Sequence, residues 1–220
     1  ILPGKGIFVL GRSFKESQIS LDIFLSMIKS IDGANRIGNF KSISKKDIFK
    51  MEYWPLERAK ISNKKESNFL GNIVVITGGC GTIGLAIAEE FLDEGAEVIL
   101  LDNDKKNISS IPKYIKNKSI LLNCDVTSHL KIKKVLKKII NIFGGIDIII
   151  SNAGKAFEGE MVNVKTETIK KSYEINFFSH QYISQESVKI FKKQKLGGLV
   201  LFNISKQSIN PGKNFGPYGL

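Results

Sequence analysis

The sequence has few of the residues that form cross-links or metal sites. Its 220 residues include only two cysteines, Cys80 and Cys124, and two histidines, His129 and His180. Two cysteines do not make the disulfide framework of a small secreted domain, so we expect a reducing, cytoplasmic location. The histidines have neither the spacing of metal ligands nor that of a catalytic triad. We therefore predict no metal site and interpret both histidines as surface or helix-packing residues.

Long apolar runs are missing as well. No stretch approaches the ~20 consecutive apolar residues that a membrane helix needs, so we expect no membrane partner. The first residues, ILPGKGIFVLGRSF, do not have the basic start and apolar core of a secretory signal. They also lack an initiator Met, and we expect the sequence to be a fragment of a longer chain.

Arginine is scarce although the chain is strongly basic. The formal net charge is +12, but only three of the 33 basic residues are arginines, and the lysines are dispersed. Nucleic-acid recognition favours arginine, whose planar guanidinium matches phosphates and base edges. The lysine-rich composition therefore indicates a compositional bias, and we expect no nucleic-acid partner. A basic nucleic-acid binder is the least favoured hypothesis, and its binding to DNA would be sensitive to salt.

The polar stretch NKKESNF at 63–69 separates two regions of different character. Beyond it, short β-branched apolar runs alternate with segments of helical periodicity, as in parallel sheets whose strands are buried on both faces. We predict strands at 72–77, 97–102, 119–126, 146–154 (with its exit loop) and 198–205, and helices at 85–96, 130–143 and 168–194. This order predicts an α/β fold, a Rossmann-like doubly wound parallel sheet that binds ligands at the carboxyl ends of its strands.

A glycine-rich turn joins the first predicted strand to the first helix. Glycines let the backbone approach a pyrophosphate, and the helix N-terminus offers free N–H groups and a positive dipole end. Alone such a turn is weak evidence, but its place between a buried strand and a helix favours a phosphate site. The candidate cofactor-binding residues here are Thr77, Gly78, Gly79, Cys80, Gly81, Thr82, Ile83 and Gly84.

Asp102 closes the second predicted strand, 18 positions beyond Gly84. A carboxylate at this place can accept hydrogen bonds from the ribose hydroxyls of an adenosine, and it would repel the 2′-phosphate of NADP. NAD is therefore the predicted cofactor and NADP the less favoured one, although Lys105 and Lys106 could soften the preference. The alternative is a solvated aspartate at a strand end.

Four motifs in this order resemble the short-chain dehydrogenase/reductase family over residues 72–220. They are TGGCGTIG (77–84), CDVT (124–127), SNAG (151–154) and YEIN (173–176). The chain departs from the family pattern TGxxxGxG at Thr82, where the family has glycine. The resemblance implies that Asp125 and Val126 flank the adenine and that Asn152, Ala153 and Gly154 line the far side of the cofactor.

The resemblance also supplies candidate catalytic residues, Asn176, Ser205 and Tyr218. Tyr218 follows Ser205 by 13 positions, the spacing of the family's serine–tyrosine pair. A free tyrosine titrates near ~10, so an acid/base tyrosine needs a nearby cation to act near neutral pH. In these roles Tyr218 exchanges the proton, Ser205 orients the substrate oxygen and Asn176 supports a water path. The alternative for Tyr218 is an ordinary aromatic in a loop.

The family's lysine would lie four residues after the tyrosine, at position 222, beyond the last residue of the sequence. Lys206 directly follows the serine and does not have this spacing. We therefore expect a C-terminally truncated domain that folds poorly and is inactive by itself.

Residues 1–60 resemble the end of a class II aldolase domain fused ahead of a short-chain dehydrogenase. The segments that carry the likeness are LPGKGIFVLGRS near the start and YWPLERAK at 53–60. We predict an aldolase-like helical remnant at 1–60, a linker at 61–71 and an incomplete NAD-binding domain at 72–220. Phe49, Tyr53 and Trp54 are predicted to pack in a helical hairpin. No aldolase metal ligands are visible.

Two functions follow from these patterns. The first is an NAD-dependent oxidoreductase for a small alcohol or aldehyde (lactaldehyde-like or sugar-derived), in a fusion of the rhamnulose-1-phosphate aldolase/alcohol dehydrogenase type in carbohydrate breakdown. The resemblance implies a homo-oligomer. The alternative is a non-catalytic nucleotide-binding module derived from a short-chain dehydrogenase, which a residue other than lysine at position 222 would favour.

Overall fold

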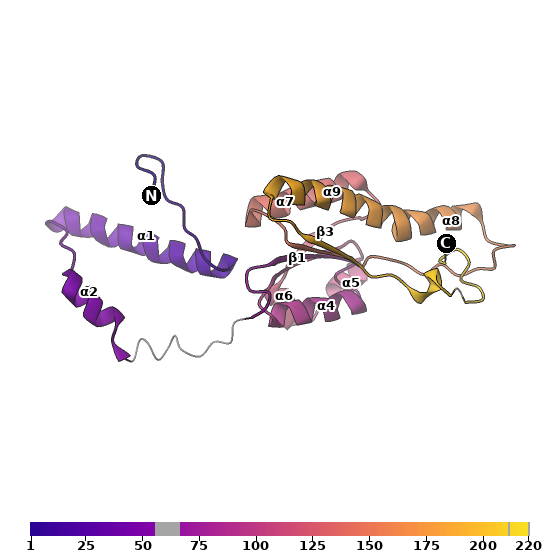
Figure 1. Cartoon of the computed structure of the whole chain (residues 1–220), viewed down its shortest axis with the longest axis horizontal. Helices are drawn as coiled ribbons and strands as arrows, with labels where there is room; N and C mark the ends of the chain where they lie inside the picture. Colours follow the sequence, from indigo (N-terminus) through magenta and orange to yellow (C-terminus); the bar gives the residue numbers. More distant parts are fainter. Residues whose placement is uncertain (56–66, 211, 220) are drawn as a thin grey trace. The chain divides into compact units, whose positions relative to one another are not determined.

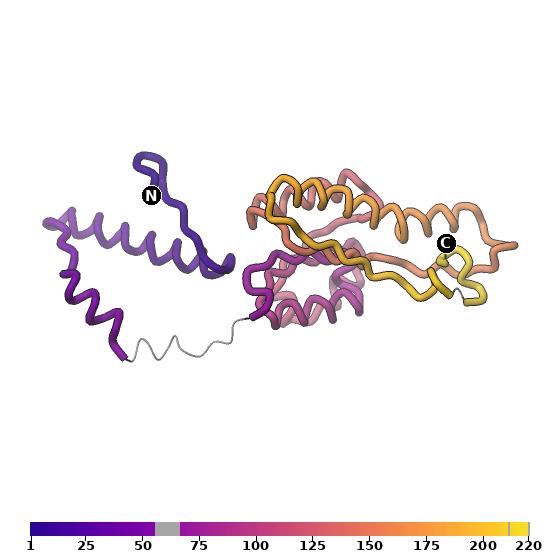
Figure 2. Tube along the Cα trace, viewed as in Figure 1, coloured from indigo at the N-terminus to yellow at the C-terminus, as the bar shows by residue number. Residues whose placement is uncertain are grey.

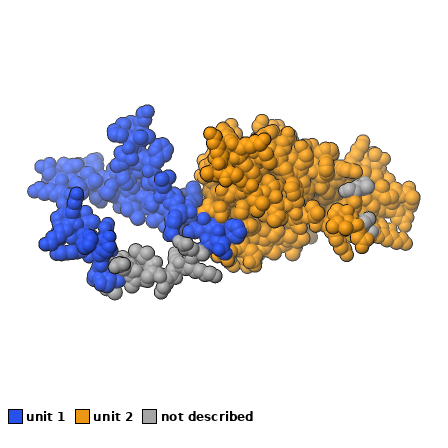
Figure 3. Space-filling model, viewed as in Figure 1, with its two compact units in different colours: residues 1–70 blue, residues 71–220 orange. Residues whose placement is uncertain are grey.

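The computed structural model describes residues 1–55, 67–210 and 212–219. The chain forms two compact units, Ile1–Leu70 and Gly71–Leu220 (Figure 3). The linker predicted at 61–71 and the continuation of the YWPLERAK segment lie largely outside the described residues.

The described residues of the first unit include the helices α1 (Phe14–Ile37) and α2 (Lys45–Glu52) (Figure 1). Each begins at a serine whose side chain accepts a hydrogen bond from a backbone N–H of the first turn, Ser13 for α1 and Ser44 for α2. Local capping therefore explains where both helices start. No described residue before position 56 is buried, however.

The predicted aromatic packing in this unit is wrong for the described residues. Phe49 and Tyr53 lie with their rings 4.4 Å apart, yet they are 60% and 55% exposed, and Trp54 is 55% exposed. Residues four apart on a helix can touch without any second element. These aromatics form a local contact and not the core of a hairpin.

The second unit is built on a five-stranded parallel sheet with the order β3-β2-β1-β4-β5 (Figures 1 and 2). β1 pairs with β2 on one side and with β4 on the other, so the chain crosses to the opposite half of the sheet after β3. Such a crossing point is where open α/β sheets bind ligands. The strands are β1 (Ile73–Thr77), β2 (Glu97–Asp102), β3 (Ile120–Asn123), β4 (Ile148–Ser151) and β5 (Leu199–Phe202).

Helices cover both faces of this sheet (Figure 1). α4 and α6 lie on one face, and α7 and α9 lie on the other. The predicted doubly wound parallel sheet is therefore confirmed. The helices are α4 (Thr82–Asp93), α5 (Lys105–Ser109), α6 (Lys113–Lys118), α7 (His129–Phe143), α8 (Thr166–Tyr173) and α9 (Ser179–Gln194), with a π-helical turn η1 (Glu174–Phe178) and a 3-10 turn η2 (Lys206–Ser208).

The main core lies between the sheet and α7. Ile132, Val135, Leu136 and Ile139 recur at the spacing of one helix face, and all four are buried. They belong to the same packed cluster as Ile149 of β4, whose side chain is fully buried. This packing holds the strand ends, and hence the loops that follow them, in place.

The elements differ from the sequence-based expectation in three ways. The third and fifth strands end three residues early, so Ser205 follows β5 instead of closing it. Two short helices, α5 and α6, connect β2 to β3, where their lysine-rich sequences give little apolar periodicity. The helix expected over 168–194 begins at Thr166 and is interrupted by η1. A π-helical turn of this kind inserts an extra residue into the helical repeat.

Candidate active site

A cavity of about 910 Å³ opens where the strands end. Loops after all five strands contribute to its wall, and its size lies in the ~300–1,000 Å³ range of small-molecule sites. The predicted site residues that line it are Gly78, Gly81, Thr82, Ile83, Gly84, Asp102, Val126, Asn152, Ala153, Gly154, Asn176, Ser205 and Tyr218. Four predicted residues do not line it: Thr77, Gly79, Cys80 and Asp125.

The glycine turn is tightly packed at Gly78, Gly79 and Gly84, and a Cβ on Gly79 would lie 2.9 Å from the carbonyl oxygen of Ile76. Gly78 has φ +60°, and a Cβ there would lie 2.9 Å from the Cα of Ala153. A Cβ on Gly84 would lie 2.4 Å from the carbonyl oxygen of Gly78, closer than real Cβ contacts allow. By contrast, the nearest atom to a Cβ on Gly81 would be 3.4 Å away. Glycine is therefore required at 78 and 84 for the turn to lie against α4 and β4.

The N-terminus of α4 faces the cavity. Its N-cap residue, Gly81, has no side chain to accept the first N–H groups, and Thr82 and Ile83 line the cavity as exposed residues. Free N–H groups at a helix start, with the positive end of the dipole, suit an anionic group. Thr82 keeps this end open although it replaces the family's glycine, so the turn fits a pyrophosphate.

Hydrogen bonds of Thr77 and Asn152 hold the glycine turn against the end of β4. The Thr77 hydroxyl accepts hydrogen bonds from the backbone N–H groups of Asn152 (2.9 Å) and Ala153 (3.0 Å). The Asn152 amide donates to the carbonyl oxygens of Thr77 (3.1 Å) and Gly78 (3.2 Å). Thr77 is buried, so the structure places it as a support that joins the ends of β1 and β4.

Asp102 is buried and yet lines the cavity. Its two carboxylate oxygens accept backbone N–H groups from Cys80 and Asp104, each at 3.0 Å. Because each carboxylate oxygen can accept more than one hydrogen bond, capacity remains for a ligand hydroxyl. Burial, together with the nearby Asp102 carboxylate, raises the pKa of the Cys80 thiol to about 12. Cys80 is therefore a packed side chain of the turn and not a nucleophile.

Three residues after β2 line the cavity next to Asp102, and the sequence analysis did not predict them. Asn103, Asp104 and Asn107 line the cavity, whereas Lys105 and Lys106 do not. Asp104 is the N-cap of α5 and accepts the N–H of Lys106 at 2.8 Å. An aspartate that caps a helix directly after a strand is the sequence signal that would have placed Asp104 at the cavity.

Asp125 turns away from the cavity. Its carboxylate accepts hydrogen bonds from the Thr127 hydroxyl (2.7 Å) and from Nζ of Lys131 (3.1 Å). The hydrogen bond from Thr127, followed by the lysine, lowers the pKa of the Asp125 carboxyl below its usual value. Its neighbours Cys124 and Val126 line the cavity instead. The Asp125 carboxylate is engaged at the start of α7 and the residue does not line the cavity, and its expected place beside an adenine stays a prediction.

Asn176 lies in η1 and ties that turn to the loop after β4. Its Oδ1 accepts the backbone N–H of Lys155, and its Nδ2 donates to the Lys155 carbonyl, both at 2.9 Å. Nδ2 also donates to the Ser172 hydroxyl at 3.0 Å. Both ends of the Asn176 side chain are thus engaged, and they fix the loop on which Lys155 enters the cavity wall.

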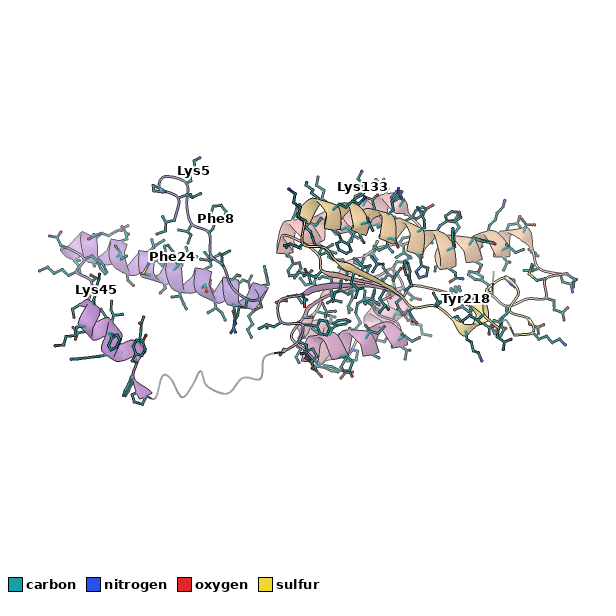
Figure 4. The ribbon with its side chains drawn as sticks, in the orientation of Figure 1. Lys5, Phe8, Phe24, Lys45, Lys133 and Tyr218 are labelled. Atoms are coloured by element: carbon teal, nitrogen blue, oxygen red, sulfur yellow. The ribbon has the colours of Figure 1, made fainter. Side chains whose placement is uncertain are left out.

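Ser205 and Tyr218 both line the cavity, and both come from the segment after β5. Ser205 is the N-cap of η2, and its hydroxyl accepts the Gln207 N–H at 3.3 Å. Tyr218 is half-buried on the loop that follows η2 (Figure 4). Within the described chain, no hydrogen bond to its hydroxyl is formed. A bond from the Gly159 N–H to the Asn214 carbonyl (2.7 Å) joins the Tyr218 loop to the loop after β4.

His180 and Asn203 are cavity residues that the sequence analysis missed. His180 was interpreted as a surface or helix-packing residue, but it lines the cavity and its Nδ1 lies 2.6 Å from the Ser151 hydroxyl. Asn203 donates to Oδ1 of Asn152 at 2.8 Å. The regular helical repeat does not place His180 at the cavity, because the π-helical turn η1 before it changes the phase of the helix. His129 lies outside the cavity and contacts Glu186 of α9 at 2.9 Å.

Among the described residues, no group of three or more His, Cys, Asp or Glu side chains is placed to hold a metal ion. Within the same part of the chain, no helix has the length and apolar character to cross a membrane.

Two family models match the chain. Residues 72–219 match the model described as short chain dehydrogenase, and residues 1–61 match the model described as aldolase class II, second domain. The first match covers well over half of the chain and includes every residue that lines the cavity.

Curated relatives agree with the first match. The uncharacterized oxidoreductase YuxG of Bacillus subtilis (strain 168) is 30% identical over 228 residues, which cover 99% of this chain and 32% of that protein. The 3-oxoacyl-[acyl-carrier-protein] reductase FabG of Haemophilus influenzae is 31% identical over 65% of this chain and 60% of its own length. The chain thus spans about a third to three fifths of these relatives.

Solved structures show the same fold. A short-chain type dehydrogenase/reductase from Mycobacterium marinum aligns with a TM-score of 0.65 at 23% identity, over 70% of this chain and 64% of that one. The crystal structure of NAD⁺-bound xylitol dehydrogenase aligns with the same TM-score at 23% identity, over 69% and 60% of the two chains. With the family match over residues 72–219, the sheet order and the glycine turn, the chain belongs to the short-chain dehydrogenase family.

Proposed function

We propose that this chain is part of an NAD-dependent oxidoreductase that acts on a small alcohol or aldehyde. The observation that carries the proposal is the meeting of two sets of residues in one cavity. Asp102 and the glycine turn form one end, and Asn176, Ser205 and Tyr218 contribute to the same wall from η1 and from the segment after β5. A cofactor held at the first set would extend toward the second.

The charges near β2 support NAD over NADP. Asp102 and Asp104 both line the cavity there. Among the described residues that line the cavity, the single lysine is Lys155, which follows β4. Two carboxylates would repel the 2′-phosphate of NADP, whereas Asp102 has acceptor capacity left for ribose hydroxyls. The glycine turn, where Cβ atoms at 78 and 84 would collide with backbone, suits the pyrophosphate.

The bound nicotinamide would accept or supply the hydride. Ser205 would hold the substrate oxygen by a hydrogen bond, and the Tyr218 hydroxyl, which lacks a partner within the described chain, would exchange the proton of that oxygen. In alcohol oxidation the phenolate form of Tyr218 would take the O–H proton while the hydride of the C–H bond leaves for the nicotinamide, and in carbonyl reduction the phenol would return the proton as the hydride arrives. Asn176 would keep the loop at Lys155 in place beside this proton path.

A fusion with an aldolase is the second element of the proposal. Residues 1–61 match the second domain of class II aldolases, and the similarity to YuxG extends over 99% of the chain. An aldolase that releases a small aldehyde would supply a substrate for a dehydrogenase on the same chain. We therefore propose a bifunctional, cytoplasmic homo-oligomer in carbohydrate breakdown, with a lactaldehyde-like compound as the substrate.

The test uses the full-length protein, with NADH formation measured on small diols and hydroxy-aldehydes. We expect Tyr218→Phe to lower kcat by about 100-fold or more, because positioned acid/base groups contribute ~10²–10⁴-fold. Tyr114→Phe is the matched control, since Tyr114 is a half-exposed tyrosine of α6 outside the cavity. Unchanged turnover in Tyr218→Phe would contradict the assigned role. NADH binding without turnover in the wild-type protein would favour a non-catalytic nucleotide-binding module.

A further inference from the structure

A buried serine and a cavity-lining histidine form a pair that the proposed chemistry does not use. Ser151 is the last residue of β4 and is 1% exposed. Its Oγ lies 2.6 Å from Nδ1 of His180, the second residue of α9. The pair therefore connects the end of a central strand to the helix that follows Asn176.

Hydrogen-bond accounting assigns the tautomer of this histidine. The Ser151 hydroxyl is shielded from water, and its hydrogen bond within the described chain is the one to His180. A buried O–H without an acceptor is costly, so the Ser151 hydroxyl must donate to Nδ1. Nδ1 then carries no proton, and the neutral ring has its proton on Nε2. Burial also lowers the pKa of the His180 imidazole, which keeps the ring neutral near pH 7.

The second ring nitrogen of His180, Nε2, is available to a ligand. Within the described chain, no protein hydrogen bond is formed by Nε2, and no side-chain nitrogen or oxygen is both buried and unpartnered. Nε2 is therefore accessible, and His180 belongs to the cavity wall. The ring also packs against Phe202 at the end of β5, with ring centroids 5.9 Å apart. The ring thus lies at the ends of β4 and β5, and its neighbour Phe202 directly precedes Asn203 in the chain.

A neutral, fixed N–H donor at this place suits an uncharged oxygen acceptor. We propose that His180, held in its Nε2–H tautomer by Ser151, donates a hydrogen bond to a carbonyl oxygen of the bound ligand. The inference rests on the proposed function, in which two such oxygens enter this half of the cavity. One belongs to the carboxamide of the nicotinamide, and the other belongs to the carbonyl form of the substrate.

The tautomer can be measured without any ligand or activity. Long-range ¹⁵N–¹H spectra of the full-length protein distinguish Nε2–H from Nδ1–H imidazole, and His180→Gln identifies the His180 signals by their loss. We expect the Nε2–H form in the wild-type protein and a mixture of both tautomers in Ser151→Ala. A ring in the Nδ1–H form, or one unaffected by Ser151→Ala, would overturn the proposal.

Ligand contact is tested by titration and by variants. Gln places an amide N–H near the Nε2 position, whereas Phe keeps the volume and removes the donor. We expect His180→Phe to weaken the contacted ligand about tenfold, the usual effect of one hydrogen bond, and His180→Gln to retain most of the affinity. A structural role alone would not give this rescue by Gln. Kinetics at saturating cofactor and NADH fluorescence titrations separate the two ligands.

Three outcomes decide the proposal. If NADH alone shifts the His180 ring signals and His180→Phe raises the Kd of NADH, the acceptor is the cofactor carboxamide. If NADH leaves the signals unmoved and His180→Phe raises the substrate KM at an unchanged Kd of NADH, the acceptor is the substrate carbonyl. No change in any of these quantities would refute the inference. Failure of the wild-type protein to bind NADH would instead contradict the proposed function, and the ligand-free tautomer would still be measured.

Discussion

β1 and β2 lie inside the sheet, whereas β5 lies at its edge in the described chain. The loops after the inner strands and the loop after the edge strand all line the cavity. Leu100 of β2 is fully buried, and the turn after β1 is held by the hydrogen bonds of Thr77, Asn152 and Asp102. On the other side, Leu201 of β5 is 46% exposed, and Tyr218 lies on a loop. The cofactor end is therefore held by burial and by a closed set of hydrogen bonds, while the Tyr218 end depends on an edge strand and loop contacts.

The largest difference in stability should come from truncating a leucine to alanine, once in β2 and once in β5. Leu100→Ala should lower the free energy of unfolding of the second unit by about 2–5 kcal/mol, because a fully buried leucine leaves a cavity. Leu201→Ala should lower it by less than about 1 kcal/mol, because about half of that side chain is already in water. Amide hydrogen exchange of β1 and β4 in the full-length protein measures both losses. Equal losses would remove the contrast between the two ends.

The glycine turn provides the second test. In Gly84→Ala the new Cβ would lie 2.4 Å from the Gly78 carbonyl oxygen, so the turn or α4 must move. Overpacking of this kind costs about 1–3 kcal/mol, and we expect a loss of NADH affinity of roughly 5- to 150-fold. Gly81→Ala is the control, since its nearest contact is 3.4 Å. If both variants bound NADH like the wild type, the proposal that the glycine turn binds the pyrophosphate would be wrong.

The smallest expected effect concerns two aspartates that the sequence treats alike. Asp102→Asn should weaken NADH about tenfold and narrow the preference for NADH over NADPH, because a charged acceptor is lost from the cavity wall. Asp125→Asn should leave NADH binding unchanged, since that carboxylate is engaged by Thr127 and Lys131. Fluorescence titrations with both cofactors measure the change. An equal loss in Asp125→Asn would return this residue to the cofactor site.

Much of the second unit could be predicted because its signals are local. The runs IVVIT and EVILLD are β-branched and apolar, and they form strands at or within one residue of the predicted positions. The stripe Ile132, Val135, Leu136 and Ile139 has helical spacing and forms the predicted helix face. The same kind of local signal misled in the first unit, where Phe49 and Tyr53 meet on one helix but cover no core.

The direction of side chains at the cavity could not be predicted in the same way. Asp125 and Val126 are adjacent, yet the structure turns one toward Lys131 and the other into the cavity. Near His180, the extra residue of η1 changes the phase of the helix relative to a regular 3.6-residue repeat. Neither result follows from residue types alone, because each depends on where the strand or helix ends against its neighbours.

The residue patterns of this chain were sufficient for the order of the strands and the long helices, the glycine turn and the acidic residue that ends β2. Periodicity and turn chemistry act over a few residues, so they can be read without knowing the fold. Tertiary structure alone decided that Thr77 supports Asn152 across 75 positions and that Ser151 orients His180 across 29. These contacts form because β1 and β4 pair as neighbours and α9 packs on β4, and sheet order and packing are properties of the whole folded unit.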